Sequence, residues 1–253
     1  MAKNAPIFVC AECGAIHARW SGRCDSCGAW NTVQEETGVA ASLPKSVGVA
    51  RTGKTRAAAL VSLEGEEAAP PRLSAAVEEL DRVLGGGLVP ASAVLVGGDP
   101  GIGKSTLLLQ AAARVAETGR RVLYCSGEES PHQIRARGER LGISGPPLYL
   151  LAETCVERVL EEITRLSPGL VIIDSIQTMY SSKLESAPGT IGQVREAATQ
   201  LLFMAKSRNV PVLIVGPVTK DGGLAGPKVL EHIVDTVLNA LRHNSAGVEE
   251  ARA

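Results

Sequence analysis

Downstream of about residue 90, short apolar runs alternate with longer segments in which apolar positions recur at helical spacing. From these runs we predict five β-strands, at residues 93–96, 122–125, 148–151, 170–173 and 212–215. The runs are apolar at consecutive positions, so both faces of the resulting sheet must be covered. The pattern therefore predicts an α/β fold in which a mainly parallel sheet is flanked by helices.

The N-terminal part of the chain lacks this alternation. Between Gly38 and Leu63 there is no acidic residue, and Lys45, Arg51, Lys54 and Arg56 are scattered among small residues. A stretch with no sustained period and few large apolar groups is expected to be a flexible tether. It is either simply solvated or able to follow a phosphate backbone. We therefore divide the chain into an N-terminal module, a linker, the α/β domain and a divergent tail, at residues 1–37, 38–72, 73–240 and 241–253.

Four of the six cysteines form two Cys-x2-Cys pairs in the N-terminal module, Cys10 with Cys13 and Cys24 with Cys27. Each pair is followed by glycine, which adopts the positive φ that a metal knuckle needs. Four thiolates complete a tetrahedral zinc site, so the predicted Zn²⁺ is structural and His17 is left out of the ligand set. Metal binding would stabilise a segment too short to fold by apolar burial. The alternative is a redox dithiol or a chance spacing.

Both tryptophans of the chain, Trp20 and Trp30, lie in this module. We expect them to cover the metal as a small core, the alternative being a stacking face for unpaired bases. The two remaining cysteines, Cys125 and Cys155, have no partner spacing and are expected to be small core residues.

The first predicted strand leads directly into a glycine-rich segment with the spacing G-x4-G-K-S, followed by a helical pattern. Glycines let successive backbone N–H groups face phosphates, and the helix N-terminus adds its positive dipole. We assign Lys104 to the β- and γ-phosphates of ATP and Ser105 to Mg²⁺. The expected ligands of ATP and Mg²⁺ in this segment are Gly98, Asp99, Pro100, Gly101, Ile102, Gly103, Lys104, Ser105 and Thr106.

A second motif follows the predicted strand at residues 170–173, which ends in Asp174. A carboxylate at this edge of the sheet lies beside the glycine-rich loop and can hold the water shell of the Mg²⁺. Since Asp174 is followed by serine, the general base must come from another strand. The candidates are Glu128 and Glu129, of which we favour Glu128. The alternative role for either is a negative charge at the start of the next helix.

Composition changes this picture little. Of the 253 residues 45% are hydrophobic, and the net charge is -1, so DNA contacts must come from local basic patches. The first residues do not show the charged segment followed by an apolar segment that is typical of a signal peptide. No apolar run is long enough to span a membrane. The sequence therefore predicts a cytoplasmic protein with no membrane contact, in which reduced thiols favour metal ligation.

Taken together, the cysteine module, the glycine-rich loop and Asp174 resemble the bacterial RadA (Sms) family of DNA repair proteins, relatives of the RecA recombinase core. The resemblance runs from about Phe8 to Leu238. It is carried, in order, by WSGRCDSCGAWN at 20–31, LDRVLGGGL at 80–88, YCSGEES at 124–130, IDSIQT at 173–178, ESAPG at 185–189 and VTKDGGLAGPKVLEH at 218–232.

The resemblance implies a RecA-like P-loop NTPase core behind a zinc knuckle of four cysteines. It also implies an ATPase stimulated by single-stranded DNA, which forms a homo-hexameric ring, branch-migrates recombination intermediates and works with a RecA-type recombinase. In such cores two loops at the sheet edge face DNA in the ring channel, here residues 181–192 and 218–227. Lys183, Lys220 and Lys228 are the candidate phosphate contacts.

The chain departs from the family pattern in three places. Pro217 stands where the family has histidine, so a polar group expected near the γ-phosphate is missing. A Lys-Asn-Arg-Phe-Gly motif, whose basic residues resemble arginine fingers, and the Lon-protease-like domain after it are absent. Residues from 239 onward do not resemble the family's last strand, which indicates a truncated or frame-shifted product. Because an arginine finger contributes a factor of ~10³ or more, we expect ATP binding to survive better than ATP turnover.

Three functions therefore compete. The leading hypothesis is a DNA-dependent ATPase of recombinational repair, acting on single-stranded or branched DNA. The second is a module that binds ATP and DNA without efficient turnover. The third is a helicase-like or clock-type ATPase on the same core, against which the zinc module argues by analogy.

Overall fold

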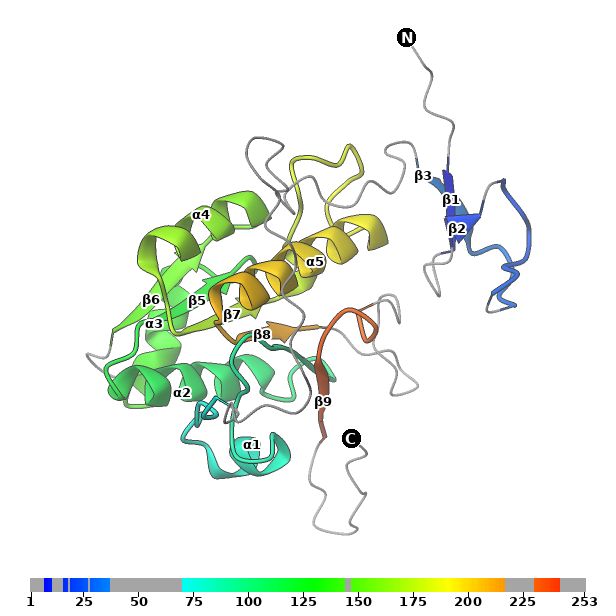
Figure 1. Ribbon diagram of the computed structural model, residues 1–253. Helices are drawn as coiled ribbons and strands as arrows, with labels where there is room; N and C mark the ends of the chain where they lie inside the picture. Colours follow the sequence, from blue (N-terminus) through cyan, green and yellow to red (C-terminus); the bar gives the residue numbers. More distant parts are fainter. Residues whose placement is uncertain are drawn as a thin grey trace, which may run out of the picture.

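The computed structural model describes residues 7–10, 16–17, 19–26, 28–36, 70–143, 147–216 and 230–241. These residues form a small three-stranded antiparallel sheet near the N-terminus and a six-stranded parallel sheet with helices on both faces (Figure 1). The predicted α/β fold with a parallel sheet flanked by helices is confirmed. No helix in the described part of the chain is long and apolar enough to cross a bilayer.

All five predicted strands are present in the large sheet. They are β4 (Ala93–Gly98), β5 (Val122–Ser126), β6 (Leu148–Ala152), β7 (Leu170–Asp174) and β8 (Val212–Val215). The strand order is β6-β5-β7-β8-β4-β9, and every neighbouring pair is parallel. The carboxyl ends of all these strands therefore meet at one edge of the sheet.

The sixth strand, β9 (Thr236–Ala240), lies at the end of the predicted α/β domain and is not among the five predicted strands. It pairs with β4 from Val94↔Thr236 to Gly98↔Ala240. An edge strand needs little apolar surface of its own, because backbone hydrogen bonds to a buried neighbour hold it in place. For that reason its apolar pattern is too weak to predict it.

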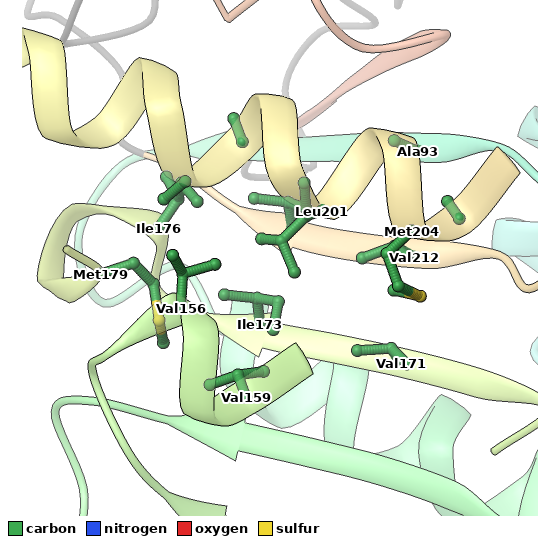
Figure 2. Packing of buried hydrophobic residues seen from close by; sticks show 14 of the residues in the cluster. Ala93, Val156, Val159, Val171, Ile173, Ile176, Met179, Leu201, Met204 and Val212 are labelled. Carbon is green, nitrogen blue, oxygen red and sulfur yellow. The ribbon is translucent and has the colours of Figure 1, made fainter. Parts of the chain in front are cut away.

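Alternation along the central strands divides the core into two layers. On one face, Val171 and Ile173 pack with residues of α4 (Val156–Leu166) and α5 (Ile191–Arg208). Figure 2 shows Leu201 and Met204 of α5 above Ile173 and Val171 of β7. On the other face, buried side chains of the same strands pack with α1 (Glu78–Val83), α2 (Lys104–Glu117) and α3 (Pro131–Arg140). Burial on both faces explains why the strands are continuous apolar runs.

The N-terminal sheet has the order β2-β1-β3, with β1 (Ile7–Cys10), β2 (Ile16–His17) and β3 (Val33–Glu36). Its described buried cluster contains only Cys10, Cys24 and Val33, with Phe8 packed against it. The two tryptophans lie outside this cluster, with Trp20 60% and Trp30 69% exposed. The expectation that they form a core over the metal is therefore wrong, since the thiols themselves occupy the interior.

The other two cysteines lie in the α/β domain as expected. Cys125 is fully buried on β5 and Cys155 is nearly so at the start of α4. Burial raises the pKa of the Cys125 thiol to about 12, so this thiol stays protonated and unreactive.

Candidate functional site: a nucleotide site at the sheet edge

The glycine-rich loop connects β4 to α2, with its glycines in conformations that other residues rarely adopt. The φ angles of Gly98, Gly101 and Gly103 are 140°, 76° and 104°. A Cβ at Gly98 would lie 2.8 Å from the carbonyl oxygen of Ala240, whereas Cβ atoms at Gly101 and Gly103 would meet nothing within 4 Å. The loop is thus closed on its β9 side and open elsewhere, which fits a cradle for phosphates.

Lys104 is the first residue of α2 and folds back over this loop. Its Nζ donates hydrogen bonds to the carbonyl oxygens of Gly98, at 2.5 Å, and Asp99, at 3.0 Å. The ammonium group and the positive end of a 14-residue helix therefore meet at the same place. All nine predicted ATP and Mg²⁺ ligands of residues 98–106 lie along this turn and the start of the helix.

Asp174 ends β7 and is 5% exposed. Because β8 lies between β4 and β7, the two strands that carry the loop and the carboxylate are not neighbours. Tyr124 of β5 links them, since its hydroxyl donates to Asp174 Oδ2 at 2.6 Å and lies 3.4 Å from the carbonyl oxygen of Ser105. Burial, and then the charge of Asp174, raise the pKa of Tyr124 far above its usual range, so the phenol remains a donor.

Glu128 lies in the turn after β5 and reaches the residue that follows Asp174. Ser175 Oγ donates to Glu128 Oε1 at 2.5 Å, and the N–H of Gly127 donates to the carbonyl oxygen of Asp174 at 3.2 Å. Ser126 Oγ accepts the N–H group of Glu128 at 3.3 Å, which fixes the turn. The structure thus brings the carboxylates of two predicted site residues to adjacent strand ends.

Glu129 is engaged differently from its neighbour. It forms a partly buried ion pair with Arg137 of α3, with side chains 30% and 14% exposed respectively. Glu129 Oε2 and Arg137 Nη1 are buried and have no hydrogen-bond partner among the described residues. Ser130 and Gln133 form a capping box that starts α3, so the charge of Glu129 lies just before a helix N-terminus.

Gly127 is a site residue that the sequence pattern does not assign. A Cβ there would lie 2.7 Å from Thr154 Cγ2 and 2.8 Å from Thr178 Cβ, and closer still to Thr178 Oγ1. Thr178 in turn donates to the carbonyl oxygen of Ser175 at 2.9 Å. The glycine between Ser126 and Glu128 is the available signal in the sequence. Its reason, a close approach to another segment, appears only in three dimensions.

The predicted DNA contacts are only partly within the described residues. Lys183 has a half-exposed side chain whose Nζ lies 3.9 Å from Glu157 Oε1, a weak ion pair. Lys220, Lys228 and Pro217 lie outside the described residues.

The segment that carries Lys183 is anchored at its start by buried polar side chains. Gln193 of α5 donates to the carbonyl oxygens of Ser181, Leu184 and Ser186, the last at 2.7 Å. Burial alone would raise the pKa of Glu157, but hydrogen bonds from Ser181 Oγ, the N–H of Ser182 and the Cys155 thiol lower it to about 2. Glu157 is therefore ionised and holds the segment at ordinary pH.

Two of the four predicted zinc ligands are described, and both are buried. Cys10 Sγ lies 3.2 Å from Thr32 Oγ1, and Cys24 Sγ lies 3.4 Å from Nε2 of His17. Cys13 and Cys27 lie outside the described residues, and no cluster of three or more metal-ligating side chains occurs among the residues that are described. Gly28 has the positive φ expected after a cysteine pair, 76°.

Buried thiols in a module with so small an apolar cluster fit a structural Zn²⁺. The ion would be held by the four predicted cysteines. The predicted set omits His17, whose Nε2 nevertheless lies beside Cys24, one of the predicted ligands.

A parallel α/β domain with a glycine-rich loop, an adjacent lysine and a carboxylate at the same sheet edge defines the P-loop class of nucleotide-binding proteins. Residues 64–223 match the AAA domain family, and residues 8–35 match the rubredoxin metal binding domain family.

Similar proteins of known name narrow the family within this class. The DNA repair protein RadA of Brucella abortus (strain 2308) is 50% identical over 250 residues, covering 94% of this chain and 52% of the relative. The DNA repair proteins RadA of Bacillus subtilis (strain 168) and Aquifex aeolicus (strain VF5) are each 46% identical, with 94% of this chain and 52% of the relative covered. The chain belongs to the AAA domain family and, within it, to the RadA proteins. It spans about half the length of the curated relatives it matches.

Proposed function

We propose that this chain is a DNA-dependent ATPase of recombinational DNA repair. The observation that carries the proposal is the convergence of Lys104, Asp174 and Glu128 at one edge of the sheet, linked through Tyr124 and Ser175. A cation for the phosphates, a carboxylate for the metal and a second carboxylate for water are the parts that phosphoryl transfer to water requires.

Each residue has a separate role in this proposal. The N–H groups of the loop and Lys104 bind the β- and γ-phosphates, and Ser105 and Asp174 would hold Mg²⁺. When bound, Mg²⁺ neutralises charge that develops on the phosphate oxygens. Glu128 accepts a proton from the water that attacks the γ-phosphorus, and the bond to the β–γ bridging oxygen breaks to release ADP and phosphate.

Glu128 is the better base of the two candidates because of its partners. It accepts a hydrogen bond from a neutral serine, which orients the carboxylate without neutralising it. Glu129 is paired with the guanidinium of Arg137, so its charge is already compensated. We therefore assign Glu129 to the support of α3 rather than to catalysis.

The names of the relatives support a role in DNA repair. We extend this to binding of single-stranded or branched DNA by the loops at 181–192 and 218–227, with Lys183, Lys220 and Lys228 as phosphate contacts. The same proposal includes assembly into a homo-hexameric ring, branch migration of recombination intermediates and action beside a RecA-type recombinase. It also includes a cytoplasmic location. Zn²⁺ held by Cys10, Cys13, Cys24 and Cys27 completes it, as a structural ion.

The test measures ATP hydrolysis with and without single-stranded DNA, together with equilibrium binding of a fluorescent ATP analogue. Lys104→Ala should weaken nucleotide binding and abolish turnover. Arg114→Ala, an exposed substitution on the same helix, should change neither. Glu128→Gln should bind nucleotide normally while turnover falls by about 10²- to 10⁴-fold.

Two outcomes count against the proposal. Normal turnover in Glu128→Gln would remove the assigned base. Turnover of the unsubstituted chain at the level of Lys104→Ala, with nucleotide binding intact, would favour the module that binds ATP and DNA without hydrolysis.

A further inference from the structure

The N-terminal module presents two large aromatic rings to solvent. Trp20 and Trp30 are 60% and 69% exposed, and they are the only tryptophans in the chain. Exposing two indole rings is unfavourable unless they are covered by a partner, since each ring carries one of the largest apolar surfaces of any side chain. The described buried cluster of the module is formed without them.

The backbone holds this aromatic surface in a defined conformation. Arg23 and Trp30 are bridge partners across a turn that is closed by hydrogen bonds from Cys24 N to Ala29 O, 2.8 Å, and from Asn31 N to Gly22 O, 2.7 Å. Arg23 Nε also donates to the carbonyl oxygen of Gly28 at 3.1 Å. The Arg23 side chain and the backbone around Trp30 are fixed in this way, so they lose little conformational entropy when a ligand binds.

The charge beside the rings is positive. The guanidinium carbon of Arg23 lies over the ring of Trp30, 5.6 Å from its centroid, and Arg19 is exposed next to Trp20. Asp25, the acidic residue of this turn, lies 3.8 Å from Nδ1 of His17, and the two arginines outnumber it. Flat apolar rings flanked by guanidinium groups match bases joined by phosphates, because every base offers a π-face and every linkage a negative charge.

We propose that Trp20, Arg23 and Trp30 form a base-stacking surface for single-stranded DNA, separate from the nucleotide site and from the DNA-contact loops of the α/β domain. Bases stack on the two indole rings, and the arginines lie against the phosphates. The surface binds without sequence specificity, since every base can stack on an aromatic ring. It requires a single strand, because the base faces of a duplex are already stacked on one another.

The fluorescence of the full chain tests this directly, because every tryptophan signal comes from this surface. Without nucleotide, an oligo-dT strand should quench the fluorescence in a saturable way. An abasic strand with the same number of phosphates should quench little, and duplex DNA should quench less than the single strand. Equal responses to the oligo-dT and abasic strands, or no response to either, would overturn the proposal.

Variants attribute the effect to individual rings, using anisotropy of a labelled oligo-dT at fixed salt. Trp30→Ala and Trp20→Ala should each weaken binding roughly tenfold, and Trp30→Phe should restore part of the loss. Tyr149→Ala, which removes an exposed aromatic ring from the α/β domain, is the matched control and should bind as the unsubstituted chain does. Since both indoles are exposed, these substitutions should leave the zinc content and the melting temperature unchanged.

The outcomes are independent of those for the ATPase. Lys104-dependent hydrolysis together with unaltered binding by both tryptophan variants would overturn the stacking surface alone. Tryptophan fluorescence that responds to a protein such as a recombinase, and not to oligo-dT, would likewise overturn it and make the surface a protein-docking site.

Discussion

The N-terminal module and the α/β domain are stabilised by different means. In the α/β domain, both faces of a parallel sheet are covered by helices, and two large apolar clusters fill the layers between them. In the module, the described buried cluster is Cys10, Cys24 and Val33, and the largest side chains face solvent. Apolar burial therefore supports the part that carries the predicted nucleotide site, whereas the described apolar cluster of the N-terminal module is small, which fits support by a structural Zn²⁺. Each part should therefore fail under conditions that spare the other.

The largest expected effect is loss of the module on removal of zinc. Structural zinc contributes about 10–16 kcal/mol in small zinc-binding peptides, far more than this module's apolar cluster supplies. Chelation, or Cys24→Ala, should shift the tryptophan emission and abolish protection of the module from proteolysis, while binding of an ATP analogue persists. Cys155→Ala, a thiol substitution in the α/β domain, is the control and should leave the zinc content unchanged. An intact module without bound metal would contradict the assignment.

A substitution that creates a cavity in the core of the α/β domain should destabilise this domain and spare the N-terminal module. Ile173→Ala removes a fully buried side chain from the centre of β7, which should lower the free energy of unfolding by about 2–5 kcal/mol. Denaturant titration followed by nucleotide binding measures this loss, and zinc content should be unaffected. Val83→Ala on α1, where the side chain is 45% exposed, should cost far less. Equal losses for the two variants would mean that the cluster around Ile173 is not the stabilising core.

A smaller effect is expected where the core meets the site. Tyr124→Phe keeps the buried ring but removes the donor to Asp174, so the carboxylate loses its orientation. We expect turnover to fall about tenfold and the Mg²⁺ concentration for half-maximal activity to rise, with ATP-analogue binding little changed, as one lost charge-assisted hydrogen bond implies. Tyr149→Phe removes an exposed hydroxyl and is the matched control. Unchanged Mg²⁺ dependence in Tyr124→Phe would show that the phenol does not position Asp174.

The smallest effect concerns Glu157 and pH. Its folded-state pKa, about 2, lies below the ordinary value of 4.5, so its stabilisation is present above pH 4.5 and is lost as the pH falls toward 2. Allowing for partial exposure, the loss is on the order of 1 kcal/mol. Urea titrations of the α/β domain at pH 6 and pH 3 should therefore differ less in Glu157→Gln than in the unsubstituted chain. The same substitution at the exposed Glu161 should leave the pH dependence as it was, and an equal dependence in Glu157→Gln would contradict the role of Glu157.

Much of the α/β domain could be predicted because its signals are local. Continuous apolar runs require strands buried on both faces, and the positive-φ glycines before Lys104 have one common use, a phosphate cradle. Asp174 and Glu128 follow from their places at strand ends, since parallel strands bring their carboxyl ends to the same edge. None of these inferences needs a partner from a distant segment.

What the sequence determined by itself is therefore the set of chemical groups and the strands that deliver them. Only the tertiary structure decided how those groups are held. Tyr124 reads as one more apolar strand residue until its hydroxyl meets Asp174, 50 residues later in the chain. Gly127 becomes obligatory because Thr154 and Thr178 press against it, and β9 exists because β4 offers a free edge. Trp20 and Trp30 could have been core or surface, and only the structure shows that both are exposed. In each case the deciding energy comes from contacts between distant segments, and local sequence carries no record of them.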